Sequence, residues 1–444
     1  MDTIFAPITP VVSSAVIVVR ISGKDTVKAF KLFKKKDGSI PAFEHARVYH
    51  LKFIHNNKEL DDVIAYYFKS PKSYTGEDIL EISFHGNPKI LSMAFNEFIK
   101  LGFRFAEPGE FTKRAFLNGK LDLSQAEAVN ELISAKSEYA VMRSFEQLKG
   151  NLKADILEFK DKLIDVLSVV EVFVDFPDED IDDEQIVFCR NQLKSVIDKL
   201  SYMIDTFNKM KYFKYGVTVA IAGRPNVGKS SLLNTLLNED RAIVSDIPGT
   251  TRDFIEETIM IKDLPVRFVD TAGLRDTNSD IESAGIGFSY KRIKEADIVL
   301  LVFDASNPLS TEDINLLDDV KGENVIKVAN KCDKPICVKM DYDVLISAKS
   351  KINIDKLTDL IYERAVGADF DKSNQTFLIT ERHYNAFLDV YNTLSNLYSN
   401  FDTNKLDLIS IDLQDCLEKI TEITGQKYTN ELLDNIFSKF CIGK

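Results

Sequence analysis

The spacing of apolar residues changes along the chain, and each change marks a different kind of structure. Short β-rich apolar runs at residues 16–21, 47–53, 63–68 and 79–84 predict strands. The polar sequence His55-Asn56-Asn57-Lys58 predicts a hairpin turn, whereas residues 89–100 have helical spacing. We therefore expect residues 1–118 to form an α+β domain.

Helical periodicity follows and is interrupted once. Apolar residues recur at helical intervals through a nearly glycine-free stretch, which predicts an all-α domain beginning with residues 119–215. Residues 216–370 instead alternate short apolar strands with helices, as in an α/β domain, and helices resume over residues 371–444. Because each helical region needs a partner for its apolar face, we expect the two to pack together with the α/β domain inserted between them. Two independently folded small bundles are the alternative.

Composition narrows the class of protein. A chain of 444 residues exceeds what one core usually organises, and its 45% hydrophobic and 28% charged content is typical of a soluble globular protein. The formal charge of -13 argues against a broad nucleic-acid-binding surface, so any RNA contact must be local or shared with a partner. The scattered cysteines form no pair of CxxC units, and we expect reduced thiols in the cytoplasm. With no leader or bilayer-length apolar run, neither secretion nor membrane insertion is expected.

A phosphate-binding loop follows the first strand of the α/β region. The buried-strand pattern of residues 217–222 leads into Gly223-Arg224-Pro225-Asn226-Val227-Gly228-Lys229-Ser230 and then into a helical sequence. Glycines let backbone N–H groups approach phosphates, the lysine neutralises the β and γ oxygens, and the serine hydroxyl coordinates Mg²⁺. This P-loop predicts nucleotide contacts from Asn226, Val227, Gly228, Lys229, Ser230 and Ser231.

The next predicted strand supplies an acid for the metal. Residues 266–269 lead into Asp270-Thr271-Ala272-Gly273, which places a carboxylate beside Mg²⁺ and a backbone amide beside the γ-phosphate. Thr251, between the P-loop and this acid, can give Mg²⁺ a second hydroxyl in a loop that orders with triphosphate. Taken alone, Thr251 fits an ordinary turn equally well, and its place in the series favours the metal.

Guanine specificity is predicted by a third motif. The strand at residues 325–329 leads into Asn330-Lys331-Cys332-Asp333, and the Asp333 carboxylate can accept two parallel hydrogen bonds that guanine donates and adenine cannot. After another short strand at residues 344–346, the backbone amides of Ser347, Ala348 and Lys349 would close over the base. Together these motifs predict a GTP hydrolase with a Ras-like P-loop domain.

The P-loop series does not supply every group that hydrolysis needs. Ras-like enzymes place a water-orienting glutamine where this chain has Leu274, so another residue must hold the water. Glu282 is the leading candidate, with Asp276 and Asp280 competing. The missing positive charge could come from a monovalent ion such as potassium, held by Asn226 and the loop at residues 245–250, or from an arginine at position 252 or 275.

Motifs outside the α/β region carry a resemblance to a known family. They are Val19-Arg20-Ile21-Ser22-Gly23, Ser73-Tyr74-Thr75-Gly76-Glu77-Asp78-Ile79-Leu80-Glu81, Pro108-Gly109-Glu110-Phe111-Thr112-Lys113-Arg114-Ala115-Phe116, Lys120-Leu121-Asp122-Leu123-Ser124-Gln125-Ala126-Glu127-Ala128 and Phe440-Cys441-Ile442-Gly443-Lys444. With the P-loop series, the chain resembles the MnmE (TrmE) tRNA-modification GTPases over nearly its full length. Residues 11–15 depart from the glycine- and arginine-rich turn common in that family, which leaves open how closely the loop approaches folate.

The resemblance implies partners and cofactors. It implies a homodimer formed through the N-terminal domain, 5-formyltetrahydrofolate or a related folate, and a complex with the flavoprotein MnmG, as a heterotetramer. Together they would install an aminomethyl-type group on carbon 5 of the wobble uridine of certain tRNAs. Matching motifs put folate contacts on Arg20, Glu81, Lys120 and Lys444, magnesium on Ser230 and Thr251, potassium on Asn226, Ser245, Ile247 and Thr250, and the water-orienting acid on Glu282.

Cys441 and the rival functions leave alternatives open. Cations near Cys441 favour a reactive thiolate, whereas Phe437 and Phe440 favour a buried core cysteine. A ribosome-assembly GTPase or RNA-binding nucleotide switch predicts a basic appendage, which this acidic chain lacks. A signalling switch predicts slow turnover and tight nucleotide binding.

Overall fold

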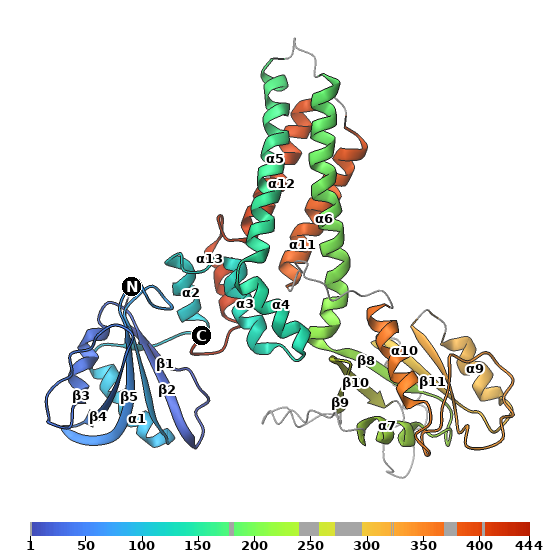
Figure 1. Cartoon of the computed structure of the whole chain (residues 1–444), viewed down its shortest axis with the longest axis horizontal. Coiled ribbons are helices and arrows are strands. Elements are labelled where there is room, and N and C mark those ends of the chain that lie inside the picture. The colour runs from blue at the N-terminus through green and yellow to red at the C-terminus, as the bar shows by residue number, and fades with distance from the viewer. Residues whose placement is uncertain are drawn as a thin grey trace. The chain divides into compact units, whose positions relative to one another are not determined.

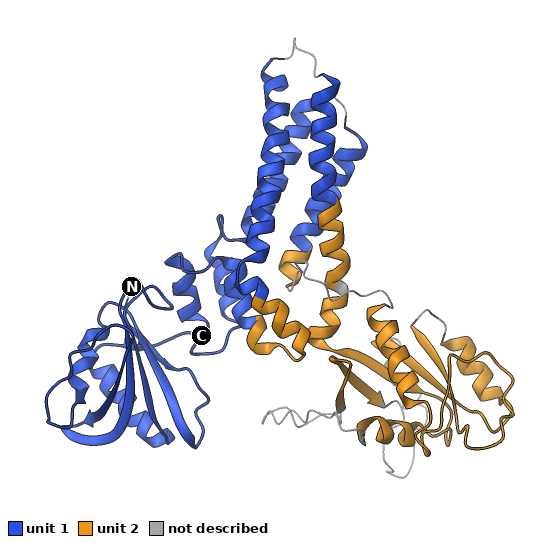
Figure 2. Cartoon of the chain, in the orientation of Figure 1, with its two compact units in different colours: residues 1–130, 146–197, 385–444 blue, residues 131–145, 198–384 orange. Residues whose placement is uncertain are grey.

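The chain forms two compact units, each built from separate parts of the sequence (Figure 2). Unit 1 comprises Met1–Asn130, Glu146–Ile197 and Asn385–Lys444, and unit 2 comprises Glu131–Phe145 and Asp198–Tyr384. The computed structural model describes residues 2–176, 182–238, 257–270, 295–320, 322, 324–367, 380–401 and 405–444. Unit 2 takes in three segments that the sequence pattern assigned to the helical domain, residues 131–145, 198–215 and the stretch that ends at Tyr384.

A seven-stranded sheet occupies the first part of unit 1 (Figure 1). Its order is β3-β4-β5-β6-β2-β1-β7, with a 3-10 helix at Thr26–Leu32 and helix α1 (Pro88–Lys100) packed against it. The strands are β1 (Ile4–Pro7), β2 (Ser14–Ser22), β3 (Phe33–Lys34), β4 (Arg47–His55), β5 (Lys58–Phe68), β6 (Ile79–Gly86) and β7 (Arg104–Phe105). The predicted hairpin is confirmed, since β4 and β5 are antiparallel and Asn56 and Asn57 turn the chain with φ of 48° and 63°.

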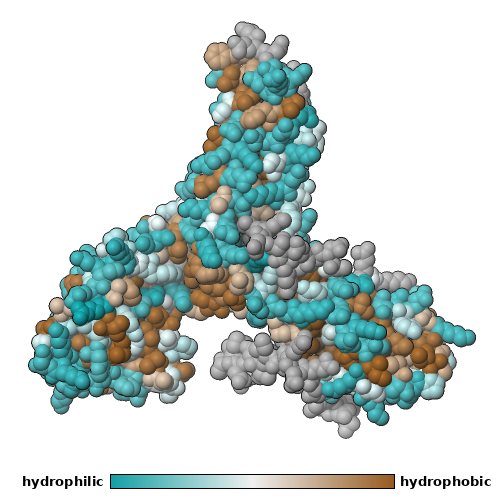
Figure 3. Space-filling model, viewed as in Figure 1, coloured by the Kyte–Doolittle hydropathy of each residue, from teal (hydrophilic) through white to brown (hydrophobic). Residues whose placement is uncertain are grey.

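Helices from both ends of the helical region pack together in unit 1, as expected from their apolar faces. Helix α5 (Asn151–Asp175) contacts α12 (Leu406–Ile423), and the Phe159 ring lies 6.1 Å from that of Phe387. The outward side of the long helices is mostly hydrophilic (Figure 3). The other described helices of the region are α3 (Leu123–Ser134), α4 (Glu138–Leu148), α6 (Asp183–Tyr215), α11 (Glu381–Ser399) and α13 (Asn430–Phe437), and α2 (Glu110–Leu117) precedes them.

The α/β part of unit 2 is a six-stranded sheet in the order β13-β12-β11-β8-β10-β9. Every neighbouring pair is parallel except β9 and β10, which form an antiparallel hairpin. The strands are β8 (Val217–Ala222), β9 (Glu257–Ile261), β10 (Leu264–Asp270), β11 (Ile298–Asp304), β12 (Val325–Asn330) and β13 (Val344–Leu345), and the helices are α7 (Lys229–Asn238), α9 (Thr311–Asp319) and α10 (Ile354–Val366). The strands predicted in this region are confirmed, apart from Ile346, which lies just beyond β13.

The hairpin between β9 and β10 contacts the start of helix α4 within unit 2. Both carboxylate oxygens of Asp263 accept hydrogen bonds from this helix, one from the Glu138 amide at 2.7 Å and one from the Tyr139 amide at 2.8 Å. Such an acid satisfies amides that a helix N-terminus leaves without partners.

Among the residues described above, no helix has the length and apolar character needed to cross a bilayer.

Candidate functional site

The P-loop joins β8 to α7 through two glycines that no other residue could replace without strain. Gly223 has φ of +149° and Gly228 has φ of +102°. A Cβ on Gly223 would lie 2.4 Å from the Val302 carbonyl oxygen, and one on Gly228 would lie 2.4 Å from the Asn330 side-chain nitrogen. The loop is therefore packed directly against β11 and against the proposed guanine-binding motif.

Lys229 and the serines after it occupy the first turn of α7. The Lys229 Nζ donates to the carbonyl oxygens of Gly223 at 2.6 Å and Arg224 at 3.0 Å, so the ammonium group lies over the loop. Ser230 and Ser231 are exposed at this helix N-terminus, where free amides and the helix dipole favour anions. An ammonium, a hydroxyl and a helix start are the groups that a magnesium-bound triphosphate requires, so the described part of the loop fits that ligand.

Asn330 connects the P-loop to the proposed base-binding loops. Its side chain is buried, and Nδ2 donates to the Val227 carbonyl at 2.9 Å. Its Oδ1 accepts from the Lys331 amide at 2.8 Å and from the Ala348 amide at 3.0 Å. One asparagine thus holds three loops in register. Thr235 of α7 adds a bond of 2.9 Å to the Ala348 carbonyl.

Asp333 is held in place by the serine of the following loop. The Ser347 hydroxyl donates to Asp333 Oδ1 at 2.6 Å, and this hydrogen bond lowers the pKa of the Asp333 carboxyl. The carboxylate is exposed, as is Lys349 nearby in the same loop. Asp333 is therefore an ionised, oriented acceptor that a ligand can reach.

Asp304 contacts the site and was not predicted from the sequence. Its Oδ2 accepts from Lys331 Nζ at 2.7 Å, and the same Nζ donates to the Asn226 carbonyl at 2.6 Å. Asp304 ends β11, just as Asn330 ends β12. The carboxyl ends of parallel strands meet at the ligand-binding edge of such a sheet. An acid at the end of the apolar run of β11 could therefore have predicted that Asp304 lies at the site.

Several proposed nucleotide and metal contacts lie outside the described residues. They are Ser245, Ile247, Thr250, Thr251, Thr271, Ala272, Gly273 and Glu282, together with the competing Asp276, Asp280, Arg252 and Arg275. Asp270 is the last residue of β10, which pairs with β8 so that Asp270 lies opposite Ile221, just before the P-loop. The backbone therefore brings this acid position and the P-loop to the same edge of the sheet.

Two of the proposed folate contacts form a pair on the N-terminal sheet of unit 1. Arg20 of β2 lies opposite Glu81 of β6, and Arg20 Nε donates to Glu81 Oε1 at 2.8 Å. The guanidinium carbon lies 5.2 Å from the centre of the Tyr74 ring and 5.3 Å from that of Phe111. Both charged side chains remain partly exposed, at 15% and 21%. Because Phe111 is fully buried, the groups open to a ligand are a carboxylate, a cation and the Tyr74 ring, which fit a flat heterocycle that carries amine donors.

The C-terminal residues reach this same part of unit 1. The Phe111 amide donates to the Lys444 carbonyl at 3.1 Å, and a Cβ on Gly443 would lie 2.3 Å from the Pro7 carbonyl oxygen. Lys120 is exposed and donates to the Pro71 carbonyl at 3.1 Å. Cys441 is an exposed free thiol, so the buried-core interpretation of this cysteine is wrong.

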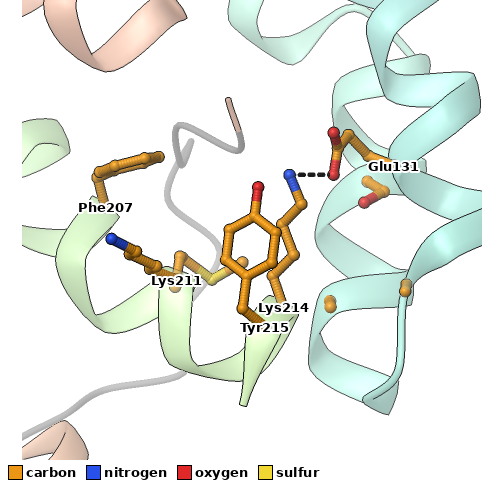
Figure 4. Close-up of a pocket in the computed structure, with 9 residues that line it drawn as sticks. Glu131, Phe207, Lys211, Lys214 and Tyr215 are labelled. Carbon is orange, nitrogen blue, oxygen red and sulfur yellow. Dashed lines mark ion pairs between the residues drawn. The ribbon is translucent and has the colours of Figure 1, made fainter. Parts of the chain in front are cut away.

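A further pocket in unit 2 contains none of the proposed contacts. It is lined by residues of α3, α4 and the end of α6, including Phe207, Lys211 and Tyr215 (Figure 4). Lys214 forms an ion pair of 2.5 Å with Glu131 there. Its ammonium group also lies 4.6 Å from the centre of the Tyr215 ring. The pocket lies just before β8, at the entry to the α/β sheet.

Comparison with protein families covers almost the whole chain. A family model described as the MnmE helical domain matches residues 123–441, and one described as the GTP-binding protein TrmE N-terminus matches residues 3–120. Relatives described as tRNA modification GTPase MnmE match from end to end. The protein from Aquifex aeolicus (strain VF5) is 42% identical over 456 positions and that from Thermotoga petrophila is 40% identical over 458, with 100% of each chain covered in both cases.

Similarity to solved structures is limited to part of the chain. A single-residue variant of Aquifex aeolicus Era bound to GDP.AlF4- is 25% identical, with 40% of this chain and 66% of that one covered and a TM-score of 0.27. The G domain of the Thermotoga maritima FeoB iron transporter is 26% identical, with 34% and 98% covered and a TM-score of 0.25.

Proposed function

This chain belongs to the MnmE family of tRNA modification GTPases, and we propose that with the flavoprotein MnmG it modifies carbon 5 of the wobble uridine of certain tRNAs. The reaction takes a one-carbon unit from a tetrahydrofolate and depends on potassium-stimulated GTP hydrolysis in the cytoplasm. Residues 1–118 bind folate and form the homodimer, residues 216–370 hydrolyse GTP, and residues 119–215 and 371–444 form the helical domain. The pair of proteins assembles as a heterotetramer that acts on tRNA.

One observation carries the nucleotide half of this proposal. Asp333 is exposed, has a lowered pKa and is fixed by the Ser347 hydroxyl at 2.6 Å. An oriented carboxylate accepts hydrogen bonds from the ring N–H and the exocyclic amine of guanine together. Adenine offers no such pair of donors, and leaving buried polar groups unpaired costs about 1–3 kcal/mol each.

Hydrolysis divides into tasks for residues around the P-loop. Lys229 and the amides that start α7 neutralise the β and γ oxygens, and Ser230 and Thr251 would hold Mg²⁺. Asn226, Ser245, Ile247 and Thr250 would hold a potassium ion, which would supply positive charge to the transition state. We assign Glu282 to orienting the attacking water and the Asp270-Thr271-Ala272-Gly273 motif to the metal and the γ-phosphate.

Base recognition is tested by titrating the purified chain with GDP, ADP and XDP. Wild type should bind GDP much more tightly than ADP. The Asp333→Asn variant should bind GDP more weakly and XDP more tightly than wild type does, because the new amide N–H can donate to an oxygen on xanthine. Asp341→Asn is the matched control, since Asp341 is another exposed aspartate of unit 2. Equal affinity of wild type for GDP and ADP would contradict the proposal.

Cation dependence is tested by GTP turnover in potassium and in sodium at equal ionic strength. Faster turnover in potassium is expected for wild type, and Asn226→Ala should reduce that difference. Equal rates in the two salts would remove the potassium part of the proposal while leaving GTP hydrolysis intact. Glu282→Ala should lower turnover with little change in GTP affinity, because the residue acts on water.

The folate part is supported by the arrangement in unit 1. Glu81 can accept from pteridine amines, and Arg20, Lys120 and Lys444 can meet the carboxylates of the folate tail. Titration with 5-formyltetrahydrofolate should show binding that Arg20→Met weakens.

Mass spectrometry of wobble nucleosides from cells lacking the chain tests the tRNA part, and unchanged nucleosides would contradict it. A Cys441→Ser variant tests whether the exposed thiol takes part, with nucleosides and GTP turnover both measured.

A further inference from the structure

Asp304 occupies a central place between the two loops that contact the nucleotide. It ends β11, which lies between β8 and β12 in the sheet. The P-loop follows β8, and Asp304 itself pairs with Asn330 at the end of β12. The family motifs include none of the residues around Asp304, yet its side chain reaches both loops through one lysine.

The Asp304 carboxylate is fixed by four donors. Oδ1 accepts from the Ser306 amide at 2.9 Å and from the Ser306 hydroxyl at 2.6 Å. Oδ2 accepts from the Asn307 side chain at 3.0 Å and from Lys331 Nζ at 2.7 Å. The residue is only 8% exposed. Its position is therefore set by its own turn, and the adaptable partner in the contact is the long side chain of Lys331.

Lys331 connects Asp304 to a residue of the P-loop. Asn226 and Lys331 both have left-handed backbones, with φ of 66° and 72°, which asparagine adopts readily but which is unfavourable for lysine. Lys331 Nζ donates to the Asn226 carbonyl at 2.6 Å. Backbone strain of this kind persists only where surrounding contacts hold it. Here the bond from Lys331 is such a contact, and Asp304 fixes the donor.

We propose that Asp304 is a positioning residue for nucleotide binding, which acts by holding Lys331 against the Asn226 carbonyl and so keeps the P-loop in its binding-ready shape. This inference rests on the proposed GTP site. Burial alone would raise the pKa of Asp304, but hydrogen bonds from Lys331 and Ser306 lower it to about 2. The anchor is thus ionised throughout the working pH range, and its effect is constant with pH.

The test compares nucleotide affinity in wild type, Asp304→Asn and a control, all as the full chain. An amide at position 304 would present a donor to Lys331 or to Asn307, so Asp304→Asn should bind both GDP and GTP about tenfold more weakly. Asp343→Asn is the control, since Asp343 is exposed and caps the Lys327 amide at 2.7 Å elsewhere on the sheet.

A double-mutant cycle distinguishes positioning from general stability. If Asp304 acts through Lys331, then Lys331→Ala and the double variant should bind GDP with the same affinity. Ser306→Ala removes the hydroxyl hydrogen bond to the Asp304 carboxylate and should weaken GDP binding slightly. This milder variant can be used if Asp304→Asn unfolds at the assay temperature. Unchanged GDP affinity in Asp304→Asn, or additive losses in the cycle, would overturn the inference. Failure of wild type itself to bind guanine nucleotides would instead count against the proposed function.

Discussion

Replacing Asn330 by alanine tests how the nucleotide site is held together before any ligand arrives. The substitution removes three hydrogen bonds, to the Val227 carbonyl, the Lys331 amide and the Ala348 amide. Val227 and Ala348 are 1% and 3% exposed, so water cannot easily replace the lost partner. At about 1 kcal/mol for each net bond, the α/β part of unit 2 should lose about 3 kcal/mol of stability.

Thermal unfolding measures this loss. A change of about 3 kcal/mol corresponds to a melting temperature lower by roughly 6–12 °C for a domain of this size. Asn330→Asp keeps both accepting contacts but buries a carboxylate with one oxygen against the Val227 carbonyl, so its melting temperature should fall at least as far as that of the alanine variant. Saturating GDP should recover less stability in Asn330→Ala than in wild type, since a disordered loop binds the ligand less tightly.

The control for Asn330→Ala is Asn324→Ala, which truncates an exposed asparagine of the same unit. It should melt within about 1 °C of wild type, because exposed substitutions rarely change stability by more than about 0.5 kcal/mol. Equal melting temperatures for Asn330→Ala and Asn324→Ala would refute the reasoning. That result would mean that the three loops hold their register without the asparagine.

Three further results are expected. Asp263→Ala removes the cap of helix α4 and should cost about 1 kcal/mol, with faster hydrogen exchange at the Glu138 and Tyr139 amides and a smaller loss in Asp263→Asn, which keeps one accepting oxygen. Arg114→Met removes a 3%-exposed cation that pairs with Glu110 and other carboxylates, and denaturant unfolding should show a loss of about 3–5 kcal/mol. Burial raises the pKa of Glu110, but hydrogen bonds from Arg104 and Arg114 outweigh it and lower the pKa overall. Ionised Glu110 therefore stabilises the folded state fully above the pKa of an unfolded glutamate, about 4.3, and this stabilisation is lost as pH falls through the lower pKa of the folded state. The difference in stability between wild type and Glu110→Gln should therefore narrow as pH falls below about 4.3, and a constant difference would contradict this assignment.

Local pattern predicted most of the elements in both sheets. Alternating apolar residues identified β4 and β5, and the pair Asn56-Asn57 identified the turn, because asparagine tolerates the left-handed backbone that such turns need. The P-loop glycines were recognisable for the same reason. In each case the decisive physics acts between residues close in sequence.

Contacts between distant segments were harder to predict. The role of Asp304 depends on Lys331, which lies 27 positions later in the sequence. No periodicity or motif connects these two positions, so the ion pair could not be predicted. The Asp263 contact with α4 joins residues 125 positions apart. Nothing in the sequence pattern places residues 131–145 with the α/β sheet, because a helix has the same periodicity whichever unit it joins.

The discontinuous make-up of unit 1 has a consequence for how the chain acquires its structure. Helix α5 ends at Asp175 and its partner α12 begins at Leu406, with the whole α/β sheet encoded between them. During synthesis, the surface of α5 that contacts α12 stays exposed while more than two hundred further residues are made. Contacts between segments far apart in sequence slow folding and leave apolar surface exposed in the unfinished chain. A ribosome stalled before α12 should therefore carry a nascent chain that chaperones bind through α5.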